Sequence, residues 1–434
     1  MIDNKIIQKK YFEVTIEKIN HNAEGVARLY SHNDAQNFLS IPYTLPNEII
    51  ITNKDNKNNN YSLNNIIQKS PDRIDEDCKF FFKCGGCLLQ HWNFKKYLDW
   101  KFNLLSKPIS KISPKTKINN IHVVKKFTRR RAKLFAKKTS KSLILGFKKY
   151  KSNNLVNINQ CIILHPQIIE IFQEIKITLN HILQTGDEIN ISINMLDNGL
   201  DILLRFKKKY NLYNFNYLNS FDHIKKISRL SFQYKDNEPE LLGIFSPVSL
   251  SLEDKQTYLL PPPGGFFQAT KFAEKVILES IFLFLKNSKK IRILDLFSGC
   301  GTISLPLLNK NHFVSAIDIN GKSIEQLVKA AKEQNLFNKL ETHICNLMKI
   351  KLEIEFLKKF DVAILNPPRS GARLQYFEIA EAKIPKIISI SCNVKTFLSD
   401  CKTLIDKGYK LKSITPIDQF LYTGHLETIA IFEI

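Results

Sequence analysis

Residues 294–302 read Leu-Asp-Leu-Phe-Ser-Gly-Cys-Gly-Thr, so an apolar strand runs directly into a turn with two glycines. Gly299 and Gly301 allow the backbone to turn tightly and bring its N–H groups close to a ligand. In an open parallel sheet such a turn lies at the carboxyl edge, where ligands bind. The stretch therefore predicts the first strand and the ligand-binding turn of an α/β domain.

The C-terminal part of the chain repeats a strand-then-helix rhythm around this turn. The predicted strands are 291–297, 313–319, 341–346, 361–366, 387–392, 410–417 and 426–434. Amphipathic segments separate most of them, which predicts a doubly wound, seven-stranded, Rossmann-like α/β domain. The last two strands have no helix between them, so we expect them to pair antiparallel as a closing hairpin.

Acidic residues near the turn indicate which cofactor it binds. The second strand ends in Asp318, about 20 residues after the turn, where a carboxylate can accept hydrogen bonds from two ribose hydroxyls. The third glycine of the dinucleotide fingerprint is absent, and Asp295 could face an ammonium group. This combination is typical of S-adenosylmethionine (SAM) sites rather than NAD sites. The alternative is a packing turn beside an unrelated acid.

Two further strands end in groups that can carry chemistry. The fourth ends in Asn366-Pro-Pro, a rigid exit that amino-methylating enzymes also use, but Arg369 here replaces the aromatic residue that stacks on their target base. The fifth ends in Cys392, which directs a thiol at the same edge of the sheet. A buried structural cysteine is the alternative interpretation.

A thiolate and a carboxylate together suit methylation of uracil at C5. Attack of a thiolate on C6 forms an enolate and makes C5 nucleophilic enough to take a methyl group from a sulfonium. A base must then remove the C5 proton so that the thiol can leave. Glu427 lies in an otherwise apolar final strand, where a carboxylate is unusual as structure but suitable as that base.

Charge and composition limit the partners. The 434 residues include 64 Lys and Arg against 41 Asp and Glu, and the net charge of +23 favours nucleic acid, with an anionic membrane surface as the alternative. Twelve basic residues and no acid lie between Lys125 and Lys151, interleaved with aromatic side chains as RNA binding requires. A solvated basic face is the alternative.

No apolar run reaches the roughly 18 residues of a membrane span, and residues 1–5 do not resemble a signal peptide, so we expect a cytoplasmic location.

Three domains are predicted. Residues 1–70 contain short strand-like segments at 12–16, 24–28, 36–41 and 48–52 and an Asn- and Lys-rich loop at 53–60, which suit a small OB-like β-barrel of the kind that binds nucleic acid. Residues 71–260 mix helix and strand signals and predict an α+β central domain. Residues 261–434 form the predicted catalytic domain.

Four of the eight cysteines lie in the central domain, and three of these are close together. Cys78, Cys84 and Cys87 lie within ten residues, and Cys161 stands alone. In a chain of intracellular type such a group usually binds metal rather than forming disulfides. Four thiolates satisfy either tetrahedral zinc or an iron–sulfur cluster, and the spacing leaves both open.

Taken together, the motifs resemble the RNA uracil-5-methyltransferase family, and within it the bacterial 23S rRNA enzymes. Residues 295–301, 366–371, 391–393 and 425–427 follow the order and spacing of that family. The resemblance implies that Cys392 is the nucleophile and Glu427 the base. The SAM contacts that it implies are Gln268, Phe297, Thr302, Asp318, Asn346 and Asn366. Asn366 departs from the pattern, because many members carry Asp there and an amide supplies no negative charge.

The same resemblance covers the N-terminal parts. Residues 24–28 and 42–46 resemble a TRAM domain, an RNA-binding barrel that members acting on tRNA generally lack. Cys78, Cys84, Cys87 and Cys161 resemble the ligands of a [4Fe-4S] cluster. The implied activity is methylation of C5 of a uridine in 23S rRNA, with RNA as the partner, no membrane and no obligate protein partner. The alternatives are a tRNA uracil-5-methyltransferase, a cytosine-5 methyltransferase and a non-catalytic iron–sulfur RNA-binding factor.

Overall fold

The computed structural model describes residues 11–30, 36–54, 60–208 and 226–434. Residues 1–5 and most of the predicted loop at 53–60 lie outside this part of the chain. Packing divides the chain into two compact units that do not follow sequence order. Unit 1 is Met1–Leu105, Lys149–Lys151 and Phe420–His425, and unit 2 is Ser106–Lys148, Ser152–Gln419 and Leu426–Ile434. The predicted boundaries at residues 70 and 260 stay a prediction.

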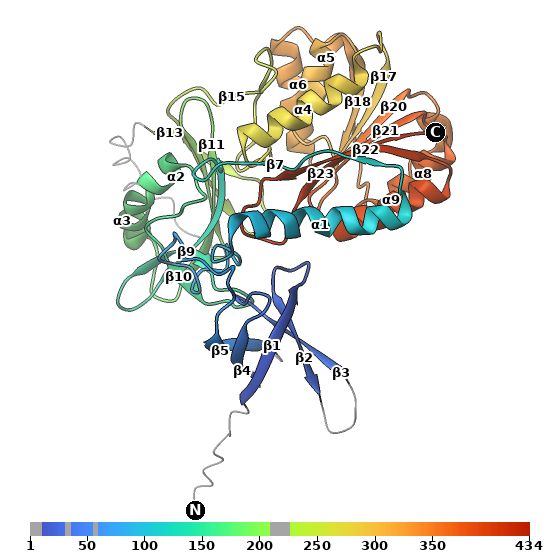
Figure 1. Cartoon of the computed structure of the whole chain (residues 1–434). Coiled ribbons are helices and arrows are strands. Elements are labelled where there is room, and N and C mark those ends of the chain that lie inside the picture. Colours follow the sequence, from blue (N-terminus) through green and yellow to red (C-terminus); the bar gives the residue numbers. More distant parts are fainter. Residues whose placement is uncertain (1–10, 31–35, 55–59, 209–225) are drawn as a thin grey trace, which may run out of the picture. The chain divides into compact units, whose positions relative to one another are not determined.

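Unit 1 contains a five-stranded antiparallel sheet in the order β3-β2-β1-β4-β5 (Figure 1). Its strands are β1 (Tyr11–Ile19), β2 (Gly25–Tyr30), β3 (Gln36–Ile41), β4 (Ile49–Lys54) and β5 (Tyr61–Gln68). The first four confirm predicted strands, whereas β5 was not predicted. The register of β5 against β4 shifts at two points. These shifts break the alternation of buried and exposed residues by which a strand is recognised from its sequence.

The apolar core of this sheet comes from alternate positions of its strands. Ile16, Ile41 and Ile50 are fully buried in it. Helix α1 (Phe94–Ile112) follows the cysteine-rich loop, and its N-terminal half belongs to unit 1. There Lys101 is fully buried, and its Nζ donates to the Tyr97 hydroxyl (2.8 Å).

Unit 2 contains a seven-stranded sheet from the central part of the chain, in the order β10-β9-β8-β11-β12-β13-β14. The elements here are β8 (Arg131–Lys138), β9 (Leu143–Lys148), β10 (Leu155–Asn157), α2 (Pro166–Glu170), α3 (Phe172–Ile182), β11 (Glu188–Met195), β12 (Leu200–Phe206), β13 (Ile227–Tyr234) and β14 (Glu240–Ile244). All neighbours pair antiparallel except β12 and β13. The basic stretch of the sequence supplies β8 and β9, and the mixture of strands and helices agrees with the α+β prediction.

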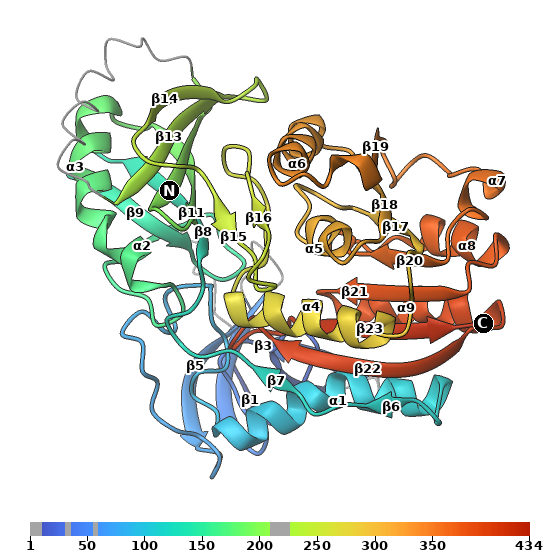
Figure 2. The ribbon, with the colours of Figure 1, turned by 90° about the horizontal axis from the view of Figure 1, so that it is seen from above.

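The second sheet of unit 2 has the order β19-β18-β17-β20-β21-β23-β22 and confirms all seven predicted strands. They are β17 (Arg292–Leu296), β18 (Phe313–Asp318), β19 (Leu340–Ile344), β20 (Val362–Leu365), β21 (Lys386–Ser391), β22 (Lys410–Asp418) and β23 (Glu427–Glu433). The closing pair β22–β23 is antiparallel, as expected. Two short strands, β6 (Lys117–Ile118) and β7 (His122–Val123), extend the sheet beyond β22 (Figure 2). Two residues are too few for a sequence pattern, so these strands were not predicted.

Helices cover both faces of this sheet. In Figure 1, α4 (Lys271–Leu285), α5 (Ser304–Asn309) and α6 (Gly321–Glu333) lie on one face, and α8 (Arg373–Glu381) and α9 (Val394–Asp406) lie on the other. Shorter elements are β15 (Leu250–Ser251), β16 (Tyr258–Leu259), the 3-10 turn η2 (Phe337–Lys339) and α7 (Ile354–Leu357). The arrangement is the predicted doubly wound fold. Among the helices that the structure describes, none is both long and apolar enough to span a membrane.

Candidate active site

The glycine turn follows β17 directly and has the backbone conformation that its sequence predicts. Phe297, Gly299 and Gly301 all have positive φ, at 62°, 55° and 96°. A Cβ on Gly301 would lie 2.4 Å from Leu327 Cδ1, so this position admits only glycine. Around Gly299, by contrast, a Cβ would meet no described atom within 4 Å. The turn is therefore packed on its Gly301 side and open on its Gly299 side.

Asp318 is held against this turn at the end of β18. Its Oδ2 accepts a hydrogen bond from the Gly299 N–H (2.9 Å), and its Oδ1 accepts one from the Asn320 N–H (2.8 Å) at the start of α6. The side chain is half-buried, so its remaining lone pairs can still accept ligand hydroxyls. This geometry suits the predicted ribose contact.

Asp295 lies within β17, just before the turn. It is fully buried, its Oδ2 accepts from Ser304 Oγ (2.5 Å), and its Oδ1 has no partner among the residues that the structure describes. Burial raises the pKa of the Asp295 carboxyl to about 7. This position favours a role in holding α5 to the turn over the predicted contact with an ammonium group.

Cys392 and Glu427 are brought together by the pairing of β21 with β23. Ser391, the last residue of β21, pairs with Thr428, so Cys392 and Glu427 both directly adjoin this pair. Burial, followed by the charge of Glu427, raises the pKa of the Cys392 thiol to about 11, whereas Arg369 acts to lower it. Cys392 also lies two residues before α9, whose N-terminus favours a thiolate.

Glu427 is nine-tenths buried or more, and burial raises the pKa of its carboxyl to about 7. Its Oε2 accepts a hydrogen bond from Gln419 Nε2 (2.6 Å), which acts in the opposite direction on that pKa. Gln419 Nε2 also donates to Gln268 Oε1 (3.3 Å). Gln268, predicted as a cofactor contact, is therefore connected to the predicted base through one buried amide.

The other predicted cofactor residues gather at one edge of the sheet. β17, β18, β19 and β20 are parallel neighbours, so the residues that follow them share the carboxyl edge. Each of these side chains is half-buried: Phe297, Thr302, Asp318, Asn346 and Asn366. Asn366 donates its backbone N–H to the Leu296 carbonyl (3.3 Å), next to the glycine turn. The turn, the carboxylate and these side chains fit a nucleoside-containing cofactor such as SAM.

Comparison with known proteins identifies the class of enzyme. Residues 247–433, which contain this whole edge, match the model of the tRNA (uracil-5-)-methyltransferase family. Over these residues the chain is similar to the RNA uracil-5-methyltransferases. Its predicted enzyme class is thereby confirmed, and the activity is SAM-dependent methylation of uracil C5 in RNA.

Relatives of this uracil-5-methyltransferase match it over almost its whole length. An uncharacterized RNA methyltransferase of Mesorhizobium japonicum is 29% identical over 423 residues, 96% of this chain and 97% of that protein. The 23S rRNA (uracil(1939)-C(5))-methyltransferase RlmD of Vibrio vulnificus is 25% identical over 447 residues, 98% of this chain and 97% of that protein. The crystal structure of Pyrococcus abyssi tRNA (uracil-54, C5)-methyltransferase with S-adenosyl-L-homocysteine covers 97% of this chain and 99% of its own, with a TM-score of 0.70 and 19% identity. It shares the fold.

The basic stretch of the uracil-5-methyltransferase is used partly for folding. Arg130 is buried and forms an ion pair with Glu274 (2.5 Å), and Arg131 donates to the Phe267 carbonyl (2.8 Å). In unit 1, Lys151 pairs with Glu24 (2.7 Å). The acids that pair with Arg130 and Lys151 come from elsewhere in the sequence. The stretch therefore carries less free positive charge than its own lack of acids indicates.

Other cations of the stretch remain available near the active site. The pKa of Lys133 is lowered by partial burial and then by the positive charges of Arg131, Arg205 and Arg369. These four cations therefore lie in one region of unit 2. Arg369 also acts on the Cys392 thiol. A group of cations beside the nucleophile suits a phosphate backbone that brings a uridine to Cys392.

The four cysteines proposed as cluster ligands are divided between the two units. Cys78, Cys84 and Cys87 belong to unit 1, and Cys161 belongs to unit 2. Cys84 and Cys87 both act on the Tyr43 hydroxyl and raise its pKa, after burial as the main cause. Within the described ranges, no three His, Cys, Asp or Glu side chains take up a metal-binding arrangement. The predicted cluster and its ligand set stay a prediction.

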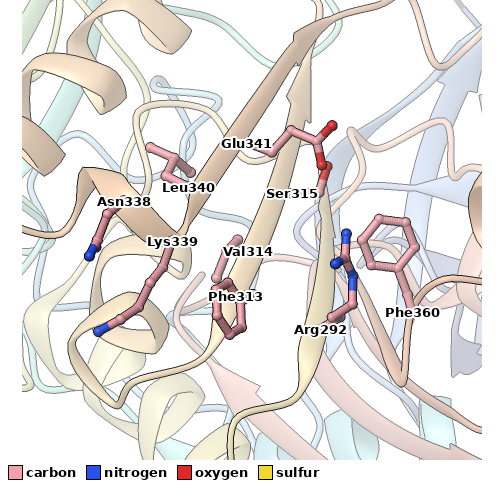
Figure 3. Close-up of a pocket in the computed structure, with 9 residues that line it drawn as sticks. All are labelled: Arg292, Phe313, Val314, Ser315, Asn338, Lys339, Leu340, Glu341 and Phe360. Atoms are coloured by element: carbon pink, nitrogen blue, oxygen red, sulfur yellow. The ribbon is translucent and has the colours of Figure 1, made fainter.

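A pocket at the opposite edge of the catalytic sheet is not the cofactor site. It is lined by Arg292, Phe313, Val314, Ser315, Asn338, Lys339, Leu340, Glu341 and Phe360 (Figure 3). Arg292, Phe313 and Leu340 are the first residues of β17, β18 and β19, so the pocket lies at the amino ends of these strands. Ligands of doubly wound sheets bind at the carboxyl ends, where the predicted residues are.

Sequence reasoning missed Arg369 and Gln419 as members of the site. Arg369 was noticed only as a departure from another motif. Gln419 belongs to no motif, and its one signal is that it is a polar residue between Ile417 and Phe420 in an apolar hairpin.

Proposed function

We propose that this enzyme methylates C5 of a uridine in 23S rRNA through a covalent bond between Cys392 and C6 of the uracil. The observation that carries the mechanism is that Cys392 and Glu427 directly adjoin the Ser391–Thr428 pair of β21 and β23, with the charge of Glu427 acting on the Cys392 thiol. A thiol and a buried carboxylate at the carboxyl edge of a methyltransferase sheet match the two groups that C5 methylation needs.

The steps follow from these two side chains. The Cys392 thiolate forms a bond to C6, and the C5=C6 electron pair moves toward the C4 carbonyl to give an enolate. SAM held at the glycine turn would supply the electrophilic methyl group; C5 takes this methyl as the sulfonium–methyl bond breaks, which leaves S-adenosylhomocysteine. Glu427 then takes the C5 proton, the C5=C6 bond re-forms, and the C6–S bond breaks. Arg369 and the N-terminus of α9 favour the thiolate that begins the sequence.

The residues that we propose hold SAM are those at the carboxyl edge, with Asp318 on the ribose. We also propose that Asn366 contributes a hydrogen bond without charge. We assign Gln268 to the same site. It is buried there and accepts a hydrogen bond from Gln419.

The match to RlmD supports rRNA as the substrate, because that protein is named for 23S rRNA and aligns with 98% of this chain. Transfer RNA is the second candidate. The Pyrococcus abyssi tRNA enzyme covers 97% of this chain, so the five-stranded sheet of unit 1 does not by itself exclude tRNA. We propose that this sheet is a TRAM-like RNA-binding module whichever RNA is the target.

Tritium release tests the proposed function. RNA labelled with tritium at uridine C5 is incubated with the enzyme and SAM, using ribosomal and transfer RNA transcripts in parallel. Release from the ribosomal transcript is the expected result. Release from tRNA alone would keep the chemistry and overturn the substrate. No release from either, with SAM shown to bind, would leave a non-catalytic RNA-binding protein.

The [4Fe-4S] cluster is a separate proposal, supported by the cysteine spacing and not by the arrangement of the thiols. We propose Cys78, Cys84, Cys87 and Cys161 as its ligands. Anaerobically purified protein should be brown and contain iron and sulfide in the proportions of one such cluster per chain. Stoichiometric zinc in a colourless protein would refute it.

A further inference from the structure

Gln419 lies directly after β22 and connects two residues of the site. Its Nε2 donates to Glu427 Oε2 (2.6 Å) and to Gln268 Oε1 (3.3 Å). The exposed fractions are 3% for Gln419, 4% for Gln268 and 3% for Glu427. A single buried amide therefore bonds to the proposed base and to a residue assigned to the SAM site.

The orientation of this amide is determined by its partners. Both are acceptors, so the nitrogen must face them, and turning the amide over would set its oxygen against a carboxylate and a carbonyl oxygen. In this orientation Gln419 Oε1 is buried without a hydrogen-bond partner among the residues described. Leaving an acceptor unpaired is unfavourable. The site tolerates it, which shows that both N–H groups of Gln419 are committed.

The surroundings of Glu427 explain why such a donor is needed. β23 is buried at every position from Glu427 to Phe432, and Leu426 and Thr428 beside the base are fully buried. A carboxylate in such surroundings lacks water to stabilise its charge or to fix its orientation. Gln419 supplies the one side-chain hydrogen bond that favours the charged form of Glu427.

We propose that Gln419 is a positioning residue for the removal of the C5 proton. Its Nε2 holds the Glu427 carboxylate in one orientation and in its charged form, and Gln268 holds Gln419. The inference rests on the proposed role of Glu427 as the base. It assigns no contact between Gln419 and the RNA.

The first test is the pH profile of tritium release by Gln419→Leu. Gln419→Leu removes a hydrogen bond to the charged form of Glu427. The acid limb of the profile, where the rate increases with pH, should therefore move to higher pH by about one unit. Release should then be about tenfold slower than wild type near pH 6.5 and close to wild type near pH 9. An acid limb at the wild-type position would overturn the proposal.

The second test separates positioning from general damage to the fold. Bond formation by Cys392 precedes the step that Gln419 serves, so Gln419→Leu should form the RNA adduct at the wild-type rate and resolve it slowly. Equal slowing of both steps would contradict the proposal. Gln334→Leu is the matched control, since Gln334 Nε2 donates to the Tyr258 and Ala330 carbonyls (2.9 Å each) in the same unit. That control should keep the wild-type acid limb.

A second substitution keeps the test decisive if Gln419→Leu does not fold. Gln419→Glu has the same shape but sets a second carboxyl beside Glu427, so its acid limb should move upward further. Glu427→Gln distinguishes the two proposals. If it releases tritium normally, the proposed function of Glu427 fails. If it traps the adduct while both Gln419 variants keep the wild-type profile, only the inference about Gln419 fails.

Discussion

At the residue scale, two buried carboxyl groups in unit 2 have a raised pKa of about 7, and burial is the main cause for both Asp295 and Glu427. Their partners differ: Asp295 accepts a hydrogen bond from Ser304, whereas Glu427 accepts one from Gln419 and its charge acts on Cys392. A carboxyl with a pKa near neutral pH is well placed to accept a proton during turnover, and this applies to Glu427 only.

Cys392→Ala should abolish methylation without unfolding the protein. The side chain is only partly buried, so its loss leaves little cavity. Tritium release and the melting temperature measure the two effects. Cys401→Ala is the matched control, because Cys401 is buried in α9 and takes no part in the proposed reaction. Substantial methylation by Cys392→Ala would remove Cys392 from the mechanism.

Tritium release by the wild-type enzyme should increase as pH rises through about 7. Glu427 accepts a proton only when ionised, and the pKa of its carboxyl is about 7 in the folded protein. Glu427→Gln should trap a covalent adduct between protein and RNA, visible as a protein band of lower mobility on denaturing gels. A wild-type rate that does not change between pH 6 and pH 8, measured with saturating SAM and RNA, would contradict this assignment.

Asp295→Asn should change how stability depends on pH. The pKa of Asp295 rises from 3.8 to about 7 on folding, so the folded state binds the proton more tightly. The free energy of unfolding therefore decreases as pH rises from about 4 to about 7. Asn keeps an acceptor for Ser304 and carries no charge, so the variant should be more stable than wild type at pH 8 by on the order of 2–3 kcal/mol. Urea unfolding at pH 5 and pH 8 measures this, and equal stabilities at pH 8 would contradict it.

At the element scale, the turn between β17 and α5 combines a structural glycine with a ligand-facing one. A Cβ at Gly301 would lie against Leu327, whereas a Cβ at Gly299 would have no described atom within 4 Å, although both glycines have positive φ. The antiparallel pairing of β21 and β23 provides the other half of the proposed site, since Cys392 and Glu427, 35 positions apart in the sequence, both adjoin its Ser391–Thr428 pair. The site is therefore formed by strand ends and not by a mobile loop.

Alanine at the two glycines should separate stability from binding. Gly301→Ala forces a Cβ to 2.4 Å from Leu327 and should destabilise the protein by about 2 kcal/mol or more. Gly299→Ala meets no such contact and should cost about 1 kcal/mol of backbone strain. Gly299→Ala should still weaken SAM binding, because its new methyl group occupies the open side of the turn. Melting temperatures and calorimetric titration with SAM measure the two effects, and equal loss of stability in both variants would refute the difference.

At the scale of the whole molecule, the net charge of +23 is distributed between folding and RNA binding. Arg130, Arg131 and Lys151 are bonded within the protein. Lys133 lies with Arg205 and Arg369 in the region of Cys392. The charge that remains after folding is the part relevant to RNA.

Lys133→Ala should weaken RNA binding and reduce its salt dependence. Loss of one phosphate contact lowers the slope of log affinity against log salt by about one. Filter binding at several salt concentrations measures this, with Lys402→Ala on the exposed side of α9 as a control that should leave the slope unchanged. An unchanged slope in Lys133→Ala would show that Lys133 contacts no phosphate.

The sequence by itself determined the seven strands of the catalytic sheet and the glycine turn, because strand periodicity and turn chemistry are properties of neighbouring residues. It also predicted Asp318, Cys392 and Glu427 as residues of the site. Only the tertiary structure decided the remaining contacts. Arg130 meets Glu274 across 144 positions, Gln419 meets Gln268 across 151, and β6 joins an edge strand formed by residues 410–418. Such contacts depend on how distant segments pack, and no local pattern records that packing. For the same reason, no motif in the sequence marked the buried amide beside the base.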